Sequence, residues 1–414
     1  MNKKIYLILL INIFFVSLLN AQIGYRFLDV NEVFMGEKSV GLGGTGVASV
    51  TGANALAWNP ANLSKLGKTE INLDLRYQYR TEFINSSQRA DLLGLYNVDS
   101  VSWNNINNAA IAIPFKINHV RVVVGASYRL KNNWNAASKR FYNYEDEYGN
   151  DNYYAYSTVQ KGGVRVLNFG ISVRPISNFS FGVSYNKLYG NFSSTSAEYS
   201  TSSSLSQYEQ LDINEYNLVG GTTTTYGIDS SRASYWEMGV AYNLFGWWNI
   251  GAKFNSPYAV REAWQNNYNE IDSFPLFYSV GSEIKLGEFY RFIIDYNKRD
   301  WSQVTEFNYT DSPPFPYSDN NLNTIHYGLI LGDNYNCFRI GYYNKKYISN
   351  DWSDEANQLK SHVITAGFGF TDYERVVTWN VGFSYEFFYN RFRYNNVSLN
   401  GHYYTFGTDL QIYF

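Results

Sequence analysis

The feature that most constrains the fold is an alternation of apolar and polar residues that begins near residue 69 and recurs up to residue 414. In residues 70–80 the apolar set is Ile71, Leu73, Leu75, Tyr77 and Tyr79, and the residues between them are Asn72, Asp74, Arg76, Gln78 and Arg80. Successive side chains of a β-strand point to opposite faces, so each such segment predicts a strand with one apolar face and one polar face.

Fourteen segments of this kind can be counted, at approximately 69–82, 106–115, 119–131, 162–175, 179–190, 232–245, 248–258, 275–286, 289–301, 322–332, 336–347, 361–371, 376–389 and 401–414. Short turns between them, such as 116–118 and 287–288, alternate with long polar stretches, such as 132–161 and 191–231. Outer-membrane barrels have an even number of antiparallel strands, with short turns at one end and longer loops at the other. We therefore predict an all-β fold, a 14-stranded antiparallel transmembrane β-barrel. A secreted β-sandwich would also alternate, but it gives no reason for this pattern of loop lengths.

The composition favours a membrane barrel. Charged residues make up 17% of the chain, whereas aromatic residues reach 19% and include 39 Tyr. Globular proteins average about 25% charged residues, and Tyr and Trp favour membrane interfaces, where one end of the side chain is apolar and the other is wet. The formal net charge of −3 argues against a basic nucleic-acid-binding protein, so no nucleic-acid partner is expected.

The first residues have the pattern of an export signal. Lys3 and Lys4 precede a mostly apolar run from Ile5 to Leu19, and Ala21 supplies a small residue for cleavage. We predict a signal peptide over residues 1–21, an N-terminal hatch or plug over 22–68, and the barrel over 69–414. Beyond residue 21 no apolar run approaches the roughly 20 residues of a membrane-spanning helix.

The predicted plug contains a stretch, residues 36–66, that is rich in Gly, Ala and Asn. Its glycines include Gly41, Gly43, Gly44 and Gly46, which allow close approach of other backbone. Trp58, Asn59, Pro60 and Ala61 follow; Pro60 fixes its own φ and biases Asn59 away from helix, which predicts a rigid corner. The glycine spacing matches a dinucleotide-binding loop, but the strand–turn–helix context that such a site needs is absent from the sequence pattern.

No catalytic or metal-binding pattern emerges. The chain has a single cysteine, Cys337, and its histidines at 119, 326, 362 and 402 are scattered, so neither a cysteine-rich zinc site nor an HExxH site is indicated. No Ser–His–Asp set follows from local spacing. We predict a non-enzymatic protein that needs no metal and no cofactor.

The polar faces of the predicted strands carry both signs of charge, as expected for a polar lumen. The inward set is Asp74, Arg76, Arg80, Arg121, Arg129, Arg174, Glu237, Lys253, Glu283, Lys285, Arg291, Asp295, Arg299, Arg339, Glu386 and Asp409. We expect most of these to pair with one another and with the plug. A ligand with a carboxylate would need a basic partner in such a lumen, and our candidates are Arg76, Arg80, Arg121 and Arg129.

The stretch SVGLGGTGVASVTGANALAWNPANLSKL resembles the hatch of the FadL/TodX (OmpP1) superfamily of outer-membrane transporters for long-chain fatty acids. The shared pattern is a Gly/Ala-rich segment followed by Asn-Pro-Ala, here Asn59-Pro60-Ala61. The resemblance implies fourteen strands, a hatch on the periplasmic side, and uptake of hydrophobic small molecules that leave sideways into the membrane. The end of the chain, with Ile412 and Phe414, resembles the strand signal that is read by the outer-membrane assembly machinery. Both resemblances imply the outer membrane of a Gram-negative bacterium, with its lipid as a partner.

A related branch of barrels, of the PorV/PorQ type, implies an alternative: a component of type IX secretion or surface attachment that binds exported proteins. Both branches share the hatch and the strand number, so both stay open at this point. In the transporters a kink in the third strand opens the wall. Here residues 119–131 offer only Gly125 as a breaker, and Pro114 lies in the second predicted strand.

Overall fold

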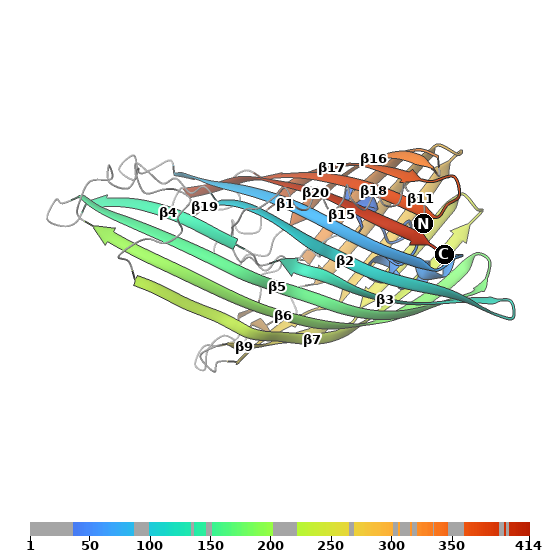
Figure 1. Cartoon of the computed structure of the whole chain (residues 1–414), viewed down its shortest axis with the longest axis horizontal. Coiled ribbons are helices and arrows are strands. Elements are labelled where there is room, and N and C mark those ends of the chain that lie inside the picture. The colour runs from blue at the N-terminus through green and yellow to red at the C-terminus, as the bar shows by residue number, and fades with distance from the viewer. Residues whose placement is uncertain are drawn as a thin grey trace.

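The fold is a closed antiparallel β-barrel (Figure 1). The computed structural model describes residues 36–86, 99–133, 136–145, 151–201, 222–264, 269–300, 305–306, 315–316, 321–333, 335–346, 360–388, 393–394 and 397–414. The predicted signal peptide and the first part of the predicted plug, residues 22–35, lie outside these ranges.

The wall follows chain order. Its strands are β1 (Glu70–Ser86), β2 (Asp99–Ile117), β3 (Val120–Asn133), β5 (Asp151–Ile176), β6 (Phe179–Thr201), β7 (Thr222–Leu244), β8 (Trp248–Asn255) with β9 (Tyr258–Trp264), β10 (Asn269–Phe274) with β11 (Phe277–Leu286), β12 (Tyr290–Asp300), β15 (Asn321–Gly332), β16 (Asn336–Lys346), β17 (Lys360–Thr371), β18 (Val377–Phe388) and β20 (Val397–Tyr413). β20 pairs with both β18 and β1, which closes the barrel. The predicted 14-stranded transmembrane barrel is confirmed.

Four shorter strands are not counted among the fourteen of the wall. β4 (Ala136–Glu145) continues the line of β3 along β5, with the same register. β19 (Arg393–Tyr394) pairs with β20, and β13 (Thr305–Glu306) pairs with β14 (Phe315–Pro316) in a separate ribbon.

Several strands extend into stretches that the sequence pattern assigns to loops. β5 starts at Asp151, β6 reaches Thr201, and β9 and β10 occupy much of 259–274. Beyond the membrane both faces of a strand meet water, so a paired strand there does not need the alternation on which the assignment was based. The long-loop prediction was therefore wrong for these parts of the chain.

Two neighbouring wall strands are interrupted at prolines. Pro257 separates β8 from β9, and Pro275 separates β10 from β11, while Tyr258 and Phe274 on either side of the breaks are paired. Proline has no N–H for the ladder. The wall is therefore broken at one level in two adjacent strands, directly beside an aromatic pair.

The outer surface of the barrel is apolar. Phe169 and Trp236 expose 52% and 51% of their surface, and Ile171 and Met238 are similarly open. Side chains of this kind on the outside of a closed barrel face lipid. Among the described residues no helix is long and apolar enough to cross a membrane.

Residues 36–66, which we call the inner segment, lie within the barrel near the end where the chain terminates (Figure 1). The segment contains α2 (Glu37–Val40), α3 (Ala55–Trp58) and the 3₁₀ helix η1 (Pro60–Lys65), joined by turns. Leu42, Leu56 and Leu63 are fully buried. The η1 helix lies against β3, β5, β6 and β7, and α2 lies against β17, β18 and β20.

A band of barrel glycines meets the inner segment. A Cβ atom at any of them would touch residues 41–61; they are Gly125, Gly170, Gly182, Gly239, Gly251, Gly281, Gly328, Gly341 and Gly367. Many lie opposite one another, as in the pairs Gly182 with Gly239 and Gly328 with Gly341. Glycine inside a strand often marks the close approach of another backbone. Here it provides the space that the inner segment occupies.

We predict that Gly341→Ala destabilises the barrel. Its Cβ would lie 2.6 Å from Gly43 Cα, and overpacking of this kind costs about 1–3 kcal/mol. The thermal midpoint in detergent should fall. The matched control is Gly67→Ala, whose Cβ would meet no atom within 4 Å; an equal midpoint for the two variants would contradict close packing at Gly341.

Candidate functional site

Carboxylates of the wall bind backbone N–H groups of the inner segment. Asp295 Oδ2 accepts from Gly46 N at 2.6 Å and from Val47 N at 2.9 Å, and Asp295 is fully buried. Glu70 Oε1 accepts from Ala53 N at 2.9 Å. A buried irregular segment needs partners for its backbone groups because no water reaches them. These inward charges therefore hold the segment in place.

The predicted glycines lie where the inner segment touches strands β12 to β17. Gly43, with φ of +67°, donates its N–H to Thr365 Oγ1 at 2.8 Å, and its carbonyl contacts His326 Nδ1 at 2.7 Å. A Cβ at Gly41 would lie 2.9 Å from Gly367 Cα. Gly44 N donates within the segment, to Ser39 O at 2.8 Å.

The Trp58–Ala61 corner is fixed by the amide of Asn59. Asn59 is fully buried; its Nδ2 donates to Val47 O at 2.9 Å and to Val240 O of β7 at 3.0 Å, and its Oδ1 accepts from Ala61 N at 3.1 Å. Asn59 is thus the N-cap of η1, with Pro60 at the first helical position. Trp58 is buried against Gly46.

Most of the charged residues predicted to face inward are buried: Asp74, Arg76, Arg129, Glu237, Lys253, Glu283, Asp295, Arg299, Arg339, Glu386 and Asp409. Several pair with one another. Lys253 Nζ lies 2.9 Å from Glu237 Oε1 and also donates to Ala57 O of the inner segment at 2.9 Å. Glu386 pairs with a residue outside the predicted set, Lys345, whose Nζ lies 3.6 Å from Glu386 Oε2.

The structure does not bring the four candidate arginines together. Arg76 in β1 is buried 3.7 Å from the Asp74 carboxylate. Arg121 lies beside the short turn after β2 and is exposed, opposite Arg174 of β5, so it is at the rim and not deep in the lumen. The Arg80 side chain lies outside the described residues. Of the candidate side chains that the structure describes, Arg129 is the one that contacts an apolar cluster, through Tyr235.

A second cation accompanies Arg129. Arg129 Nη2 donates to Tyr235 Oη at 3.3 Å, and Lys131 Nζ donates to Tyr258 Oη at 3.1 Å and lies 3.5 Å from Tyr235 Oη. All four side chains are at most 8% exposed. We call them the cation–tyrosine site. Two cations and two hydroxyl groups can bind one carboxylate or another small acidic group.

An apolar cluster adjoins this site. Tyr235 and Tyr258 belong to it, together with Val164, Val166, Leu188 and Val260, and Phe274 packs against it. The rings of Tyr235 and Tyr258 stack at 4.7 Å, and those of Tyr258 and Phe274 at 4.8 Å. Sites for small hydrophobic ligands combine an apolar lining with a few placed polar groups. The arrangement has both parts.

The wall loses its β-ladder next to this site. Within the described residues, β2 and β3 pair from Ile117 and Val120 as far as Asn108 and Arg129; beyond that point β2 pairs with β1 only, and β3 with β5 only. A register shift leaves Asn107 as an extra residue in β2, and another leaves Lys131 extra in β3. Bulges end pairing and re-aim side chains.

Neither sequence-predicted breaker ends the ladder. Gly125 pairs with Ala112, and Pro114 pairs with Val123, both in the continuous part. Sequence reasoning also missed Lys131, Tyr235, Tyr258 and Phe274. The signals available for them were Pro257 and Pro275, which flank Tyr258 and Phe274 and mark a disturbed wall.

Lysines of the inner segment are affected by burial. Burial lowers the pKa of Lys65 to about 8 and that of Lys38 to about 8. Lys65 Nζ donates to Ala48 O at 3.2 Å. Both lysines therefore lose their charge at a pH at which an exposed lysine keeps it.

Comparison with known proteins finds solved structures with a similar fold. No protein-family model matches the sequence, and no curated protein does. The toluene transporter TodX of P. putida is similar in structure, with a TM-score of 0.60 at 15% identity over 95% of this chain and 99% of that chain. A Pseudomonas aeruginosa FadL homologue gives 0.61 at 10% identity, over 95% and 100%. The Ralstonia pickettii toluene transporter TbuX gives 0.56 at 13%, over 92% and 98%. The predicted resemblance to the FadL/TodX barrels is confirmed at the level of the fold.

We predict a pH effect at Lys65. Because its folded pKa is lowered, burying the charged amine costs stability in full below about pH 8, and the cost disappears as pH rises towards the unfolded value of about 10.4. The stability of the wild type relative to Lys65→Met should therefore rise between about pH 8 and 10. Thermal unfolding at each pH measures it, with the exposed Lys68→Met as control; a difference independent of pH would contradict the shift.

Proposed function

We propose that the protein is an outer-membrane barrel that takes up hydrophobic small molecules with an acidic group, such as long-chain fatty acids. The observation that carries the proposal is the cation–tyrosine site on an apolar cluster, next to the end of the β2–β3 ladder. The names of the similar structures, toluene transporters and a FadL homologue, support uptake of hydrophobic molecules in general.

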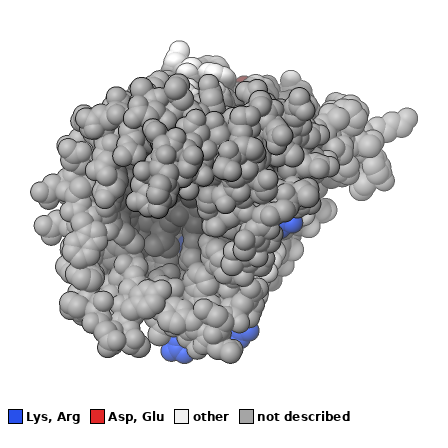
Figure 2. Space-filling view, turned by 90° about the vertical axis from the view of Figure 1, so that its left-hand side faces the viewer, with Lys and Arg blue, Asp and Glu red and all other residues white. Residues whose placement is uncertain are grey.

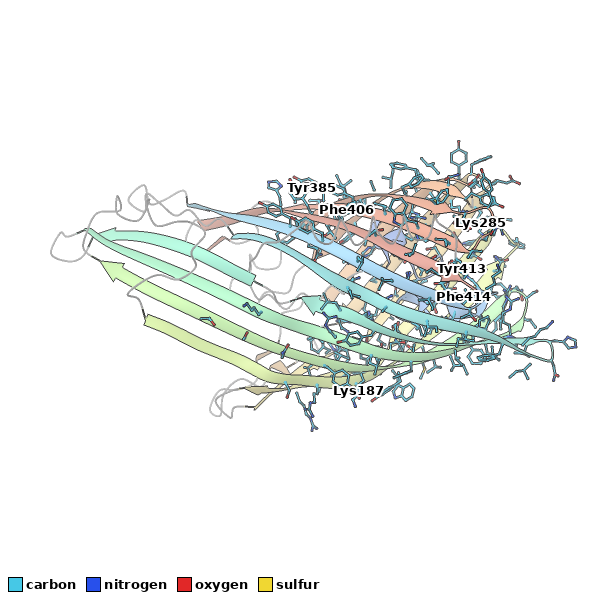
Figure 3. The ribbon with its side chains drawn as sticks, viewed as in Figure 1. Lys187, Lys285, Tyr385, Phe406, Tyr413 and Phe414 are labelled. Carbon is cyan, nitrogen blue, oxygen red and sulfur yellow. The ribbon has the colours of Figure 1, made fainter. Side chains whose placement is uncertain are left out.

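The proposal assigns a role to each part of the chain. Residues 1–21 are the signal peptide, 22–68 the hatch and 69–414 the barrel, which lies in the outer membrane. Ile412 and Phe414 belong to the assembly signal. In support of the last role, Phe414 directly follows β20, the strand that closes the barrel, and its N–H donates to Thr69 O at 2.9 Å (Figure 3).

Capture follows from the chemistry of the site. The acyl chain would leave water for contact with the apolar cluster that includes Val164, Val166 and Leu188, at a gain of about 0.8 kcal/mol per CH₂ transferred. The acidic group would bind Arg129 and Lys131, whose positions are set by the two tyrosine hydroxyl groups. The ligand thus needs both an apolar body and an anionic end.

The exit is sideways. Where a ladder ends between two strands that both continue, the backbone of the wall is not joined by hydrogen bonds, and an apolar molecule can pass into lipid without breaking any. The position beside Asn108 and Arg129 puts this exit at the third strand. The hatch closes the alternative route through the barrel.

We predict that Arg129→Gln with Lys131→Gln weakens binding of a long-chain fatty acid by at least about tenfold, because both charge-assisted contacts are lost. Native mass spectrometry of the purified barrel with added oleate measures the bound fraction. The control is Lys68→Gln with Arg375→Gln, which removes two exposed charges at the other end of the barrel.

Three further outcomes are informative. Unchanged oleate binding in the double variant would contradict the assigned site. Equal loss of toluene binding would mean that the site recognises apolar bodies and not acidic groups. A barrel that carries no small molecule but co-purifies with a large exported protein would favour the secretion role.

We predict that Asp295→Asn raises the permeability of the barrel to small solutes. The change weakens the contacts to Gly46 N and Val47 N and so loosens the hatch. Planar-bilayer conductance measures the effect, and deletion of residues 36–66 should give a larger one. Asp372→Asn is the matched control, since Asp372 also accepts two backbone N–H groups, at 2.7 and 2.9 Å, but in a turn. Conductance equal to that of the wild type would contradict a plugging role.

A further inference from the structure

Four cations lie on the outside of the wall, on neighbouring strands. They are Arg165 in β5, Lys187 in β6, Arg232 in β7 and Arg261 in β9. Each alternates with buried inward residues, such as Val166, Leu188 and Tyr235, and so points away from the lumen. Lys187, Arg232 and Arg261 are exposed and Arg165 is partly exposed; Figure 3 shows Lys187 at the outer edge of the wall.

The strand register gathers these cations. Arg165 pairs with Tyr189, Tyr189 pairs with Arg232, and Arg232 pairs with Arg261, so one row crosses four strands. Lys187 lies one step below the row, because it pairs with Leu167 and Ser234. Adjacent strands are about 4.8 Å apart, so the row spans about 15 Å.

This row is electrostatically unfavourable by itself. Arg232 lies directly opposite Arg261, and like charges in that position destabilise a sheet. On these four strands, none of the outward residues with a described side chain is Asp or Glu. The described outward side chains at this level thus include cations but no acids, which is the composition of a surface that meets an external anion.

The height of the row places it at the membrane surface. Arg232 and the exposed Tyr242 are ten residues apart in β7, and the outward residues between them include Trp236, Met238 and Val240. Ten residues at about 3.3 Å each, with a strand tilt of about 40°, span about 25 Å, which is the height of the apolar band of such barrels. Tyr242 adjoins a short turn, so the row lies at the opposite interface, towards the long loops.

Aromatic side chains accompany the row, as at the interfacial girdle of a barrel. The Arg165 guanidinium lies 5.4 Å from the Tyr128 ring and Lys187 Nζ lies 5.3 Å from the Tyr189 ring. Tyr185 and Trp236 pack together at 5.2 Å. In the view onto the long-loop end, described Lys and Arg side chains reach the surface at the margin of the molecule (Figure 2).

We infer that Arg165, Lys187, Arg232 and Arg261 bind the phosphate groups of a phosphorylated glycolipid in the outer leaflet. Arginine binds phosphate through two parallel N–H bonds. An anion held between Arg232 and Arg261 turns their repulsion into attraction, and acyl chains of the same lipid cover the apolar band below. The inference uses the membrane location and is independent of what the lumen carries.

The test compares lipid retention by the full-length barrel and a variant with Arg165→Gln, Lys187→Gln, Arg232→Gln and Arg261→Gln. Native mass spectrometry with added diphosphorylated lipid A measures the bound fraction, which should fall at least about tenfold. Lipid A without phosphates should bind both proteins weakly and equally. The control variant, Lys68→Gln, Lys116→Gln, Lys285→Gln and Arg375→Gln, removes the same charge at the turn end, where Figure 3 places Lys285, and should bind like the wild type.

Equal retention by the outward variant and the wild type would overturn the inference, as would equal loss in the control variant. If phosphatidylglycerol bound as well as diphosphorylated lipid A, the row would recognise anionic lipids in general, and the glycolipid assignment would be overturned. Capture of an acidic protein without lipid A would assign the row to a protein partner instead. If the fourfold variant fails to fold, Arg232→Gln alone is measured: its thermal midpoint without lipid should rise, and its gain in stability from lipid A should be smaller than that of the wild type.

Discussion

The interior depends on the satisfaction of backbone groups in a buried segment that has almost no regular structure. Residues 36–66 cannot form a ladder with the wall, so side chains of the wall provide their partners: Asp295 for two N–H groups, Glu70 and Thr365 for others, and Lys253 for a carbonyl. An unpaired buried backbone group costs about as much as a lost hydrogen bond. The polar inner face of the barrel is therefore first the set of hydrogen-bonding partners that holds this segment, and the candidate ligand site lies beside it.

The alternation from residue 69 onward was sufficient to predict the fold because the constraint is local: one face meets lipid and the other meets polar groups. It failed where that constraint ends. The outer parts of the long strands lie beyond the apolar band, where both faces meet water and the alternation is not required. Glycines within the predicted strands could also be identified from the sequence, since Gly182, Gly239, Gly328 and Gly341 lie inside alternating segments. That they lie opposite one another follows only from the strand pairing.

The candidate site could be predicted only in part. The alternation predicts that Arg129 faces inward, and it predicts the same for Arg121, which lies at the rim. The alternation indicates which face of the strand a side chain occupies, but not how far along the barrel axis it lies. Lys131 lies more than a hundred residues before Tyr235 and Tyr258 in the sequence, and the three meet only because of the strand register. A shift by one residue would send each side chain to the other face.

One irregularity connects the parts of the site. The extra residue at Lys131 shifts the phase of β3 by one position, so that Asn132 opposes the inward Val164. The same shift lies two residues past the last β2–β3 pair, Asn108 with Arg129. A bulge bends its strand and disrupts the ladder, and this one lies where Lys131 contacts Tyr258 and where β3 has just ceased to pair with β2. The candidate binding group and the interruption of the wall therefore lie at one irregularity of the third strand.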